Sequence, residues 1–146
     1  AGIAEASAIS AARLLPEAPR VALLSFSTHG SARHTAAEKV AKATALVRER
    51  VPDVAFDGEL QADAALVGRI AATKCREPGA VAGRANVLIF PDLSSGNIAY
   101  KLVQHLAGAR AIGPFCQGFV GPLCDLSRGA TVDDIVTATA LTLVLG

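Results

Sequence analysis

Residues 21–26 read VALLSF, and residues 86–90 read NVLIF. The first run lies between turn signals, and Pro91 ends the second. Short apolar runs of this kind are typical of strands that are covered on both faces. The two runs therefore predict a sheet that is buried between helices.

The segments around these strands have helical patterns, and proline or glycine residues stand at several of their ends. The last segment is apolar nearly all round, so we expect it to be buried, either against this domain or against another domain. A strand at 54–56, ended by Asp57-Gly58, and weaker candidates at 111–112 and 115–116 complete the pattern. The expected helices cover residues 1–15, 32–51, 61–73, 97–107 (before Gly108) and 131–145.

Strands that alternate with helices at these spacings predict an α/β fold, a three-layer α/β/α arrangement with a mainly parallel sheet. The 146 residues suffice for one domain with its own core. Ligands of such sheets bind beyond the carboxyl ends of the strands. The loops after the strands are rich in Ser, Gly, Asn and Asp, so we expect the polar chemistry at one edge of the sheet.

The composition excludes several classes of partner. The net charge is +1 and the basic residues are scattered, which argues against nucleic acid and acidic membrane surfaces. No apolar run is long enough to span a membrane, and no leader pattern opens the chain. Three cysteines without CxxC spacing predict reduced cytosolic thiols, with no disulfide framework and no zinc site. The start at Ala1 and the lack of Met favour a processed, excised or recombinant segment.

Residues 126–136, LSRGATVDDIV, carry the strongest functional pattern. Arg128 offers a charged fork for phosphate or an oxyanion, and Ser127 adds a hydroxyl. The helix start adds free N–H groups and a positive dipole end, close to the carboxylates of Asp133 and Asp134. This combination suits acyl transfer between a phosphate and a thiol. The alternative is structural: Thr131 and Asp134 also form a capping box, and an arginine in a turn is commonly just solvated.

Several motifs together resemble the C-terminal part of phosphate acetyltransferases (phosphotransacetylases). The resemblance implies half of a fold like that of isocitrate and isopropylmalate dehydrogenases. It also implies that the family's N-terminal domain, which forms the other wall of the active-site cleft, is absent. The motifs are Ser127-Arg128-Gly129, Val132–Val136, Ser25–Ser31, Asp57–Gln61 and Asn86–Leu102.

The resemblance implies reversible acetyl transfer: acetyl-CoA and inorganic phosphate give acetyl phosphate and CoA. Asp134 would then take the proton from the CoA thiol. Arg128 would hold phosphate or stabilise the acetyl oxygen, and Ser127 would orient the thiol or that oxygen. The substrates would be acetyl-CoA and phosphate, with no tightly bound cofactor and no metal. The resemblance further implies a homodimer in the cytoplasm.

The loop 25–31 is a weaker candidate, because loops between a strand and a helix can present N–H groups to phosphate. Its substrate-binding candidates are Ser27, Thr28, Gly30 and Ser31; the alternative is that Ser31 simply caps the next helix. The pattern Asp57-Gly58-Glu59 could be a pair of catalytic acids or a turn that ends a strand. Asn97, after Ser94-Ser95-Gly96, could bind substrate or cap a helix.

Two further readings belong to other functional classes. Similar domains are fused to some malic enzymes, where they sense acetyl-CoA, and this half of the family also mediates dimerisation. The presence of Ser127, Arg128 and Asp134 favours an enzyme. If the chain is complete as given, half of the cleft is missing, and we then expect the isolated chain to have little or no turnover.

Overall fold

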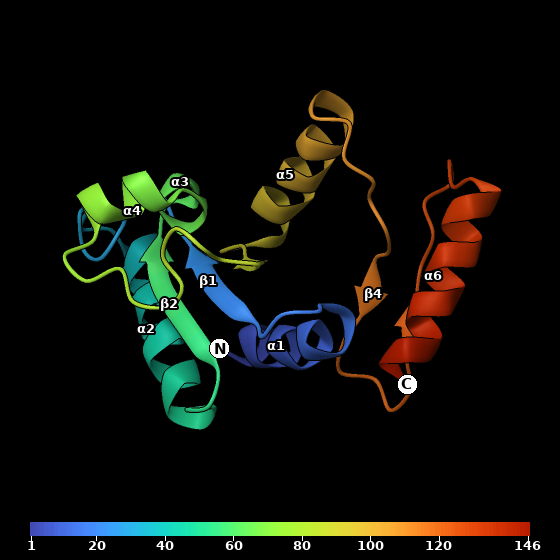
Figure 1. Cartoon of the computed structure of the whole chain (residues 1–146), viewed down its shortest axis with the longest axis horizontal. Helices are drawn as coiled ribbons and strands as arrows, with labels where there is room; N and C mark the ends of the chain where they lie inside the picture. The colour runs from blue at the N-terminus through green and yellow to red at the C-terminus, as the bar shows by residue number, and fades with distance from the viewer.

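The computed structural model describes all 146 residues, in which helices and strands alternate along the chain. The helices are α1 (Gly2–Leu14), α2 (Thr35–Arg50), α3 (Ala62–Leu66), α4 (Gly68–Lys74), α5 (Leu93–Leu106) and α6 (Val132–Leu145). The strands are β1 (Arg20–Leu24), β2 (Ala55–Leu60), β3 (Val87–Ile89), β4 (Phe115–Cys116) and β5 (Leu123–Cys124). Figure 1 shows them in the chain's colour order.

The first three strands form one parallel sheet with β1 in the middle, in the order β2-β1-β3. Side chains of a strand alternate between its two faces. Accordingly, Val21 and Leu23 belong to one buried cluster, and Ala22 and Leu24 belong to another. The expected strand that is covered on both faces is therefore confirmed.

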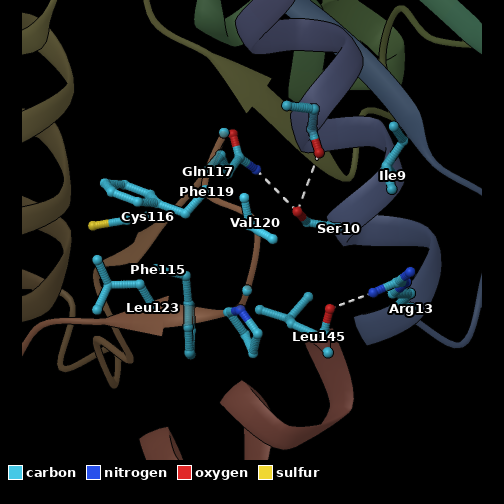
Figure 2. Close-up of a pocket in the computed structure, with 15 residues that line it drawn as sticks. Ile9, Ser10, Arg13, Phe115, Cys116, Gln117, Phe119, Val120, Leu123 and Leu145 are labelled. Carbon is cyan, nitrogen blue, oxygen red and sulfur yellow. Dashed lines mark hydrogen bonds between the residues drawn. The ribbon is translucent and has the colours of Figure 1, made fainter.

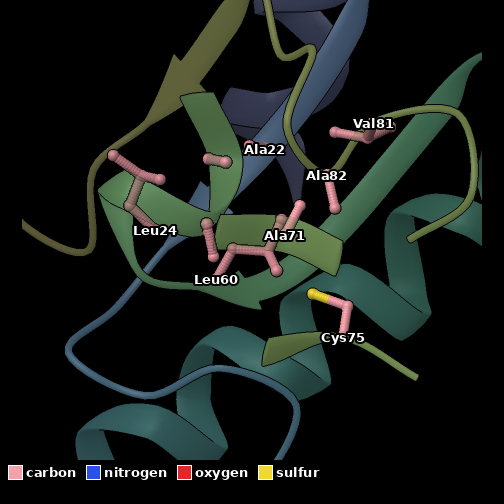
Figure 3. Close-up of a cluster of buried hydrophobic side chains, with 9 residues drawn as sticks. Ala22, Leu24, Leu60, Ala71, Cys75, Val81 and Ala82 are labelled. Carbon is pink, nitrogen blue, oxygen red and sulfur yellow. The ribbon is translucent and has the colours of Figure 1, made fainter. Parts of the chain in front are cut away.

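Helices cover both faces of this sheet. On one face Val21 and Leu23 pack with residues of α1 and α2. On the other face Ala22 and Leu24 pack with α3, α4 and the chain that follows them (Figure 3). Much of the core is alanine, so the layers pack through small side chains. This arrangement confirms the predicted three-layer α/β/α fold with a parallel sheet.

The helix expected at 61–73 is wrong in one respect, because it is broken into α3 and α4 at Val67. The chain after α4 passes close by: a Cβ on Gly83 would lie 2.6 Å from the Cα of Gly68. The Gly83 N–H also donates to the carbonyl of Ala64, 2.8 Å away. Contacts with the chain around Gly83 therefore replace the helical hydrogen bonds at this point, and no local sequence pattern indicates these contacts.

Two boundaries also differ from the prediction. The strand β2 does not end at Asp57-Gly58 but continues to Leu60. The helix α5 begins at Leu93, before the predicted loop has ended, because the Asp92 side chain accepts the Ser95 N–H at 2.8 Å and caps the helix. Gly108 follows its last turn with a φ of +66°, as predicted for the end of this helix.

The C-terminal part has a different character. The strands β4 and β5 form a separate antiparallel ribbon; β4 was predicted, β5 was not, and residues 111–112 form no strand. The helix α6 begins after its predicted cap, Thr131, and packs against α1 and β5. It lies apart from the sheet (Figure 1), and Ala138 is its one buried residue, so the expected burial is not found within this chain. None of the helices is both long and apolar enough to cross a membrane.

Candidate functional site

The carboxyl edge of the sheet carries the polar loops that the sequence pattern placed there. The strands β1, β2 and β3 are parallel, so the segments that follow them start from the same edge. These segments are the loop 25–31, the stretch from Gln61 into α3, and the turn from Pro91 into α5. Four of the predicted substrate-binding residues, Ser27, Thr28, Gly30 and Ser31, therefore lie in a loop at this edge.

Glu59 organises the loop 25–31. One of its carboxylate oxygens, Oε1, accepts both the Ser27 hydroxyl and the Gly30 N–H, each at 2.8 Å. The backbone carbonyl of Glu59 accepts the His29 N–H at 3.0 Å. Burial raises the pKa of Glu59, but the bonds from Gly30 and Ser27 outweigh it, so the pKa lies below its ordinary value. The loop is therefore folded around an ionised carboxylate of its own chain.

This network determines which loop residues a ligand could reach. Ser27 is fully buried and Thr28 is 4% exposed, and the Thr28 hydroxyl accepts the Gln61 N–H at 3.0 Å. The side chains of these two predicted substrate-binding residues thus bond to other groups of the chain, Ser27 to Glu59 and Thr28 to Gln61. Gly30 and Ser31 are exposed, although the Gly30 N–H already serves Glu59. Direct substrate contact stays a prediction for Gly30 and Ser31.

Ser31 does not cap the following helix, as the structural alternative expected. Its hydroxyl oxygen accepts the Thr28 N–H at 3.0 Å and so closes the loop. The cap of α2 is His34, whose Nδ1 accepts the Ala36 N–H at 3.1 Å. The expected helix 32–51 would include His34, but the helix begins at Thr35 and His34 stands just before it. Imidazole is a less common cap than a hydroxyl or carboxylate, which is why the pattern was missed.

Asp57 and Glu59 are not a free pair of catalytic acids, and they do not form a turn. Asp57 Oδ1 accepts Arg48 Nη2 at 2.8 Å and lies 3.1 Å from His29 Nε2, so α2 and the loop both bind it. Between the two acids, a Cβ on Gly58 would stand 2.7 Å from Thr44 Oγ1. The motif therefore connects β2 to α2 and to the loop 25–31.

The second candidate region is the start of α6. Asp134 Oδ2 accepts the Thr131 N–H at 2.9 Å and the Thr131 hydroxyl at 2.8 Å, and Thr131 Oγ1 accepts the Asp134 N–H at 3.2 Å. The capping box foreseen as the structural alternative is therefore confirmed. The backbone and side-chain bonds from Thr131, with a smaller contribution from Arg110, lower the pKa of Asp134 below its ordinary value. Its carboxylate is ionised and only partly covered.

Arg110 is the arginine that pairs with this carboxylate, whereas the sequence pattern pointed to Arg128. Arg128 lies in the turn before α6; it is exposed and takes no part in the ion pairs of the structure. Arg110, in the linker after α5, has its Nε 3.7 Å from Asp134 Oδ1. Arg110 stands 24 positions before Asp134 in the sequence, so no local spacing could have indicated it.

The structure does not bring the two candidate regions together. Ser127 and Arg128 belong to the C-terminal region beyond α5, whereas the loop 25–31 lies at the sheet edge (Figure 1). Asn97 is exposed within α5 and does not precede the helix as expected. The eight predicted site residues thus lie in three separate segments of the chain, and two of them, Ser27 and Thr28, are buried.

None of those eight residues lines either of two pockets in this structure. One, of about 320 Å³, is lined by α1, the β4–β5 ribbon and the end of α6. Figure 2 shows Gln117 bonded to Ser10 there, and Arg13 bonded to the carbonyl of Leu145. The other, of about 620 Å³, runs along β2 and includes His29 and Arg48.

Comparison with known proteins gives a consistent result. The family model described as phosphate acetyl/butaryl transferase matches residues 1–143. The chain is 59% identical to a phosphate acetyltransferase of Thermoanaerobacterium thermosaccharolyticum, covering 99% of this chain and 44% of that protein. It is 55% identical to one of Borreliella burgdorferi, covering 97% and 40%. A phosphotransacetylase from Streptococcus pyogenes superposes with a TM-score of 0.91 at 46% identity, covering 98% and 43%. The chain therefore spans less than half the length of these relatives.

Proposed function

The chain belongs to the phosphate acetyl/butaryl transferase family, and from that premise we propose that it forms part of an enzyme that transfers acetyl groups reversibly between acetyl-CoA and inorganic phosphate. Relatives at 50–59% identity carry the name phosphate acetyltransferase. Because the chain covers only 44% of the relative at 59% identity, we propose that protein outside this segment provides the other wall of the cleft. On this view the isolated chain has little or no turnover.

The proposed step is a direct attack of the CoA thiolate on the acetyl carbonyl of acetyl phosphate. Asp134 takes the thiol proton, the new C–S bond forms, and the bond between the acetyl carbon and the phosphate oxygen breaks. Arg128 stabilises the negative charge that develops on the acetyl oxygen or holds the phosphate, and Ser127 orients the thiol or that oxygen. Acetyl-CoA and phosphate are the products, and no covalent acyl-enzyme is formed. No tightly bound cofactor is needed.

The observation that carries this proposal is the arrangement at the start of α6. Asp134 is held ionised there by its bonds to Thr131, and ionisation is required of a group that accepts a proton. Arg128 is exposed and has no carboxylate partner. Because no carboxylate pairs with the Arg128 guanidinium, its positive charge is available to bind a substrate anion.

The test is Arg128→Ala in the whole protein that contains this chain. Loss of one donor to a developing oxyanion typically lowers kcat by about 10²–10³, and we expect a loss of that size. The matched control is Arg76→Ala, which removes another exposed arginine far from α6 and should leave kcat unchanged. Thioester formation from acetyl phosphate and CoA is the assay. An unchanged kcat would contradict the proposal, and acetyl-CoA binding without any turnover would favour the sensor function.

Two broader features are part of the proposal. We place the protein in the cytoplasm, because its three cysteines are free thiols, which suits a reducing compartment.

We also propose a homodimer, supported by the exposed apolar side chains of α5, among them Leu93 and Leu106. A monomer in light scattering at high micromolar concentration would remove the dimer.

A further inference from the structure

Arg110 makes three contacts with the first turns of α6. Its Nη2 donates to the backbone carbonyl of Asp133 at 3.0 Å and to the Thr137 hydroxyl oxygen at 2.8 Å. Its Nε lies 3.7 Å from Asp134 Oδ1. Two nitrogen atoms, Nη2 and Nε, therefore hold the planar guanidinium in place. The flexible ammonium group of a lysine could not make the same set of contacts.

The contact is complementary to the capping box. Thr131 binds one carboxylate oxygen of Asp134, Oδ2, through both its N–H and its hydroxyl. The other oxygen, Oδ1, is the one that faces Arg110. The carboxylate is thus held at one oxygen and faced by a cation at the other, while its residue stays partly accessible to solvent.

We infer that Arg110 is a positioning residue for Asp134, which fixes the linker on α6 and directs the free carboxylate oxygen. This inference rests on the proposed function, in which Asp134 takes the thiol proton. The charged groups around Asp134 are Arg110 on the linker and Asp133 on the same turn. The helix α1 packs against α6, and its Arg13 contacts α6 near Leu145, at the other end of the helix.

The electrostatic consequence has a definite sign. The bonds from Thr131 lower the pKa of Asp134 most, and the positive charge of Arg110 lowers it further. Replacing Arg110 by a neutral residue should therefore raise the pKa of Asp134 toward its ordinary value. The same change removes the contact at Oδ1, so that only Thr131, at Oδ2, still holds the carboxylate in position.

The experiment compares Arg110→Gln with Arg76→Gln in the whole protein. We expect Arg110→Gln to lower kcat about tenfold while the KM values for CoA and acetyl phosphate stay within about twofold, because positioning and not binding is lost. Titration of the Asp134 carboxyl by ¹³C NMR should show a higher pKa than in the wild type. Arg76→Gln should change neither quantity.

The outcomes separate this inference from the proposed function. An unchanged kcat, or an unchanged titration of Asp134, in Arg110→Gln overturns the positioning role. Asp134→Asn tests the parent proposal independently: if it retains full turnover, Asp134 is not the base, whatever Arg110 does. A fall in kcat at unchanged KM values supports the inference, and the raised pKa of Asp134 shows that Arg110 contacts this carboxylate in solution.

Discussion

Residues 1–92 and residues 93–146 bury their side chains to very different extents. Twenty-four residues are buried, and Ala138 is the only one of them beyond residue 92. Of the twenty-one large hydrophobic residues that are exposed, five precede Leu93 and sixteen lie from Leu93 onward. The first region therefore completes its own core. The second presents an amount of apolar surface that proteins normally cover with other protein.

The polar motifs of the two regions differ in the same way. Glu59, in strand β2 of the first region, is 4% exposed, and its Oε1 is bound by Ser27 and Gly30 of the loop 25–31. Asp134, in the second region, is also ionised by local hydrogen bonds, but it remains partly exposed beside Arg110. Both carboxylates are ionised, but the surrounding packing restricts Glu59 to a structural role. The Asp134 carboxylate is partly exposed and is therefore accessible to a ligand.

The largest expected effect tests the contrast in packing directly. Leu60 is fully buried between β1 and α3, whereas Leu106 is 82% exposed. In the chain 1–146, Leu60→Ala should reduce the free energy of unfolding by about 2–5 kcal/mol, because it leaves a cavity. Leu106→Ala should change it by less than about 0.5 kcal/mol. Urea unfolding measures both.

The same pair of variants sharpens the comparison in the whole protein. If other protein covers α5 there, Leu106→Ala becomes destabilising, while the cost of Leu60→Ala stays the same. A large cost of Leu106→Ala already in the chain 1–146 would contradict the division into a packed and an open region.

The fold of the first region was predictable because its signals are local. The runs VALLSF and NVLIF are apolar on both faces, and Pro16 and Pro52 stand just beyond the helices that precede them. The break at Val67 was not predictable, since it depends on the backbone around Gly83 returning to α3. The extension of β2 through Gly58 was hidden because Asp-Gly reads as a turn and only the packing against Thr44 reveals the strand.

The candidate site was predictable in its residue types and only partly in its contacts. The capping box of Thr131 and Asp134 follows from a spacing of three and was confirmed. The roles of Glu59 and Arg110 depend on partners about thirty and about twenty-four residues away, so no motif indicates them. The resemblance identified the family, and the catalytic roles of Ser127, Arg128 and Asp134 stay predictions.

The next effect concerns the buried carboxylate and its dependence on pH. The pKa of Glu59 is lowered in the folded chain, so its contribution to stability is present above the ordinary carboxyl pKa and is lost as the pH falls through the folded value. Glu59→Gln cannot ionise. We expect it to cost about 1–2 kcal/mol at pH 7 and to approach the wild type at low pH. Unfolding curves across the acid range measure this, and a constant difference at all pH values would argue against it.

The smallest expected effect is in the open region, where Thr131→Ala removes the hydroxyl of the capping box. Loss of such a cap typically costs about 1 kcal/mol of helix stability. Because α6 has only one buried residue, we expect its first turns to fray while the sheet stays folded. Amide hydrogen exchange should then quicken at the start of α6 and remain unchanged in β1.

The matched control is Thr139→Ala, since Thr139 is exposed on the same helix and its hydroxyl bonds only to the carbonyl of Ile135. Faster exchange in β1 as well would mean that α6 and the sheet unfold as one unit, and that the two regions are not separate in stability.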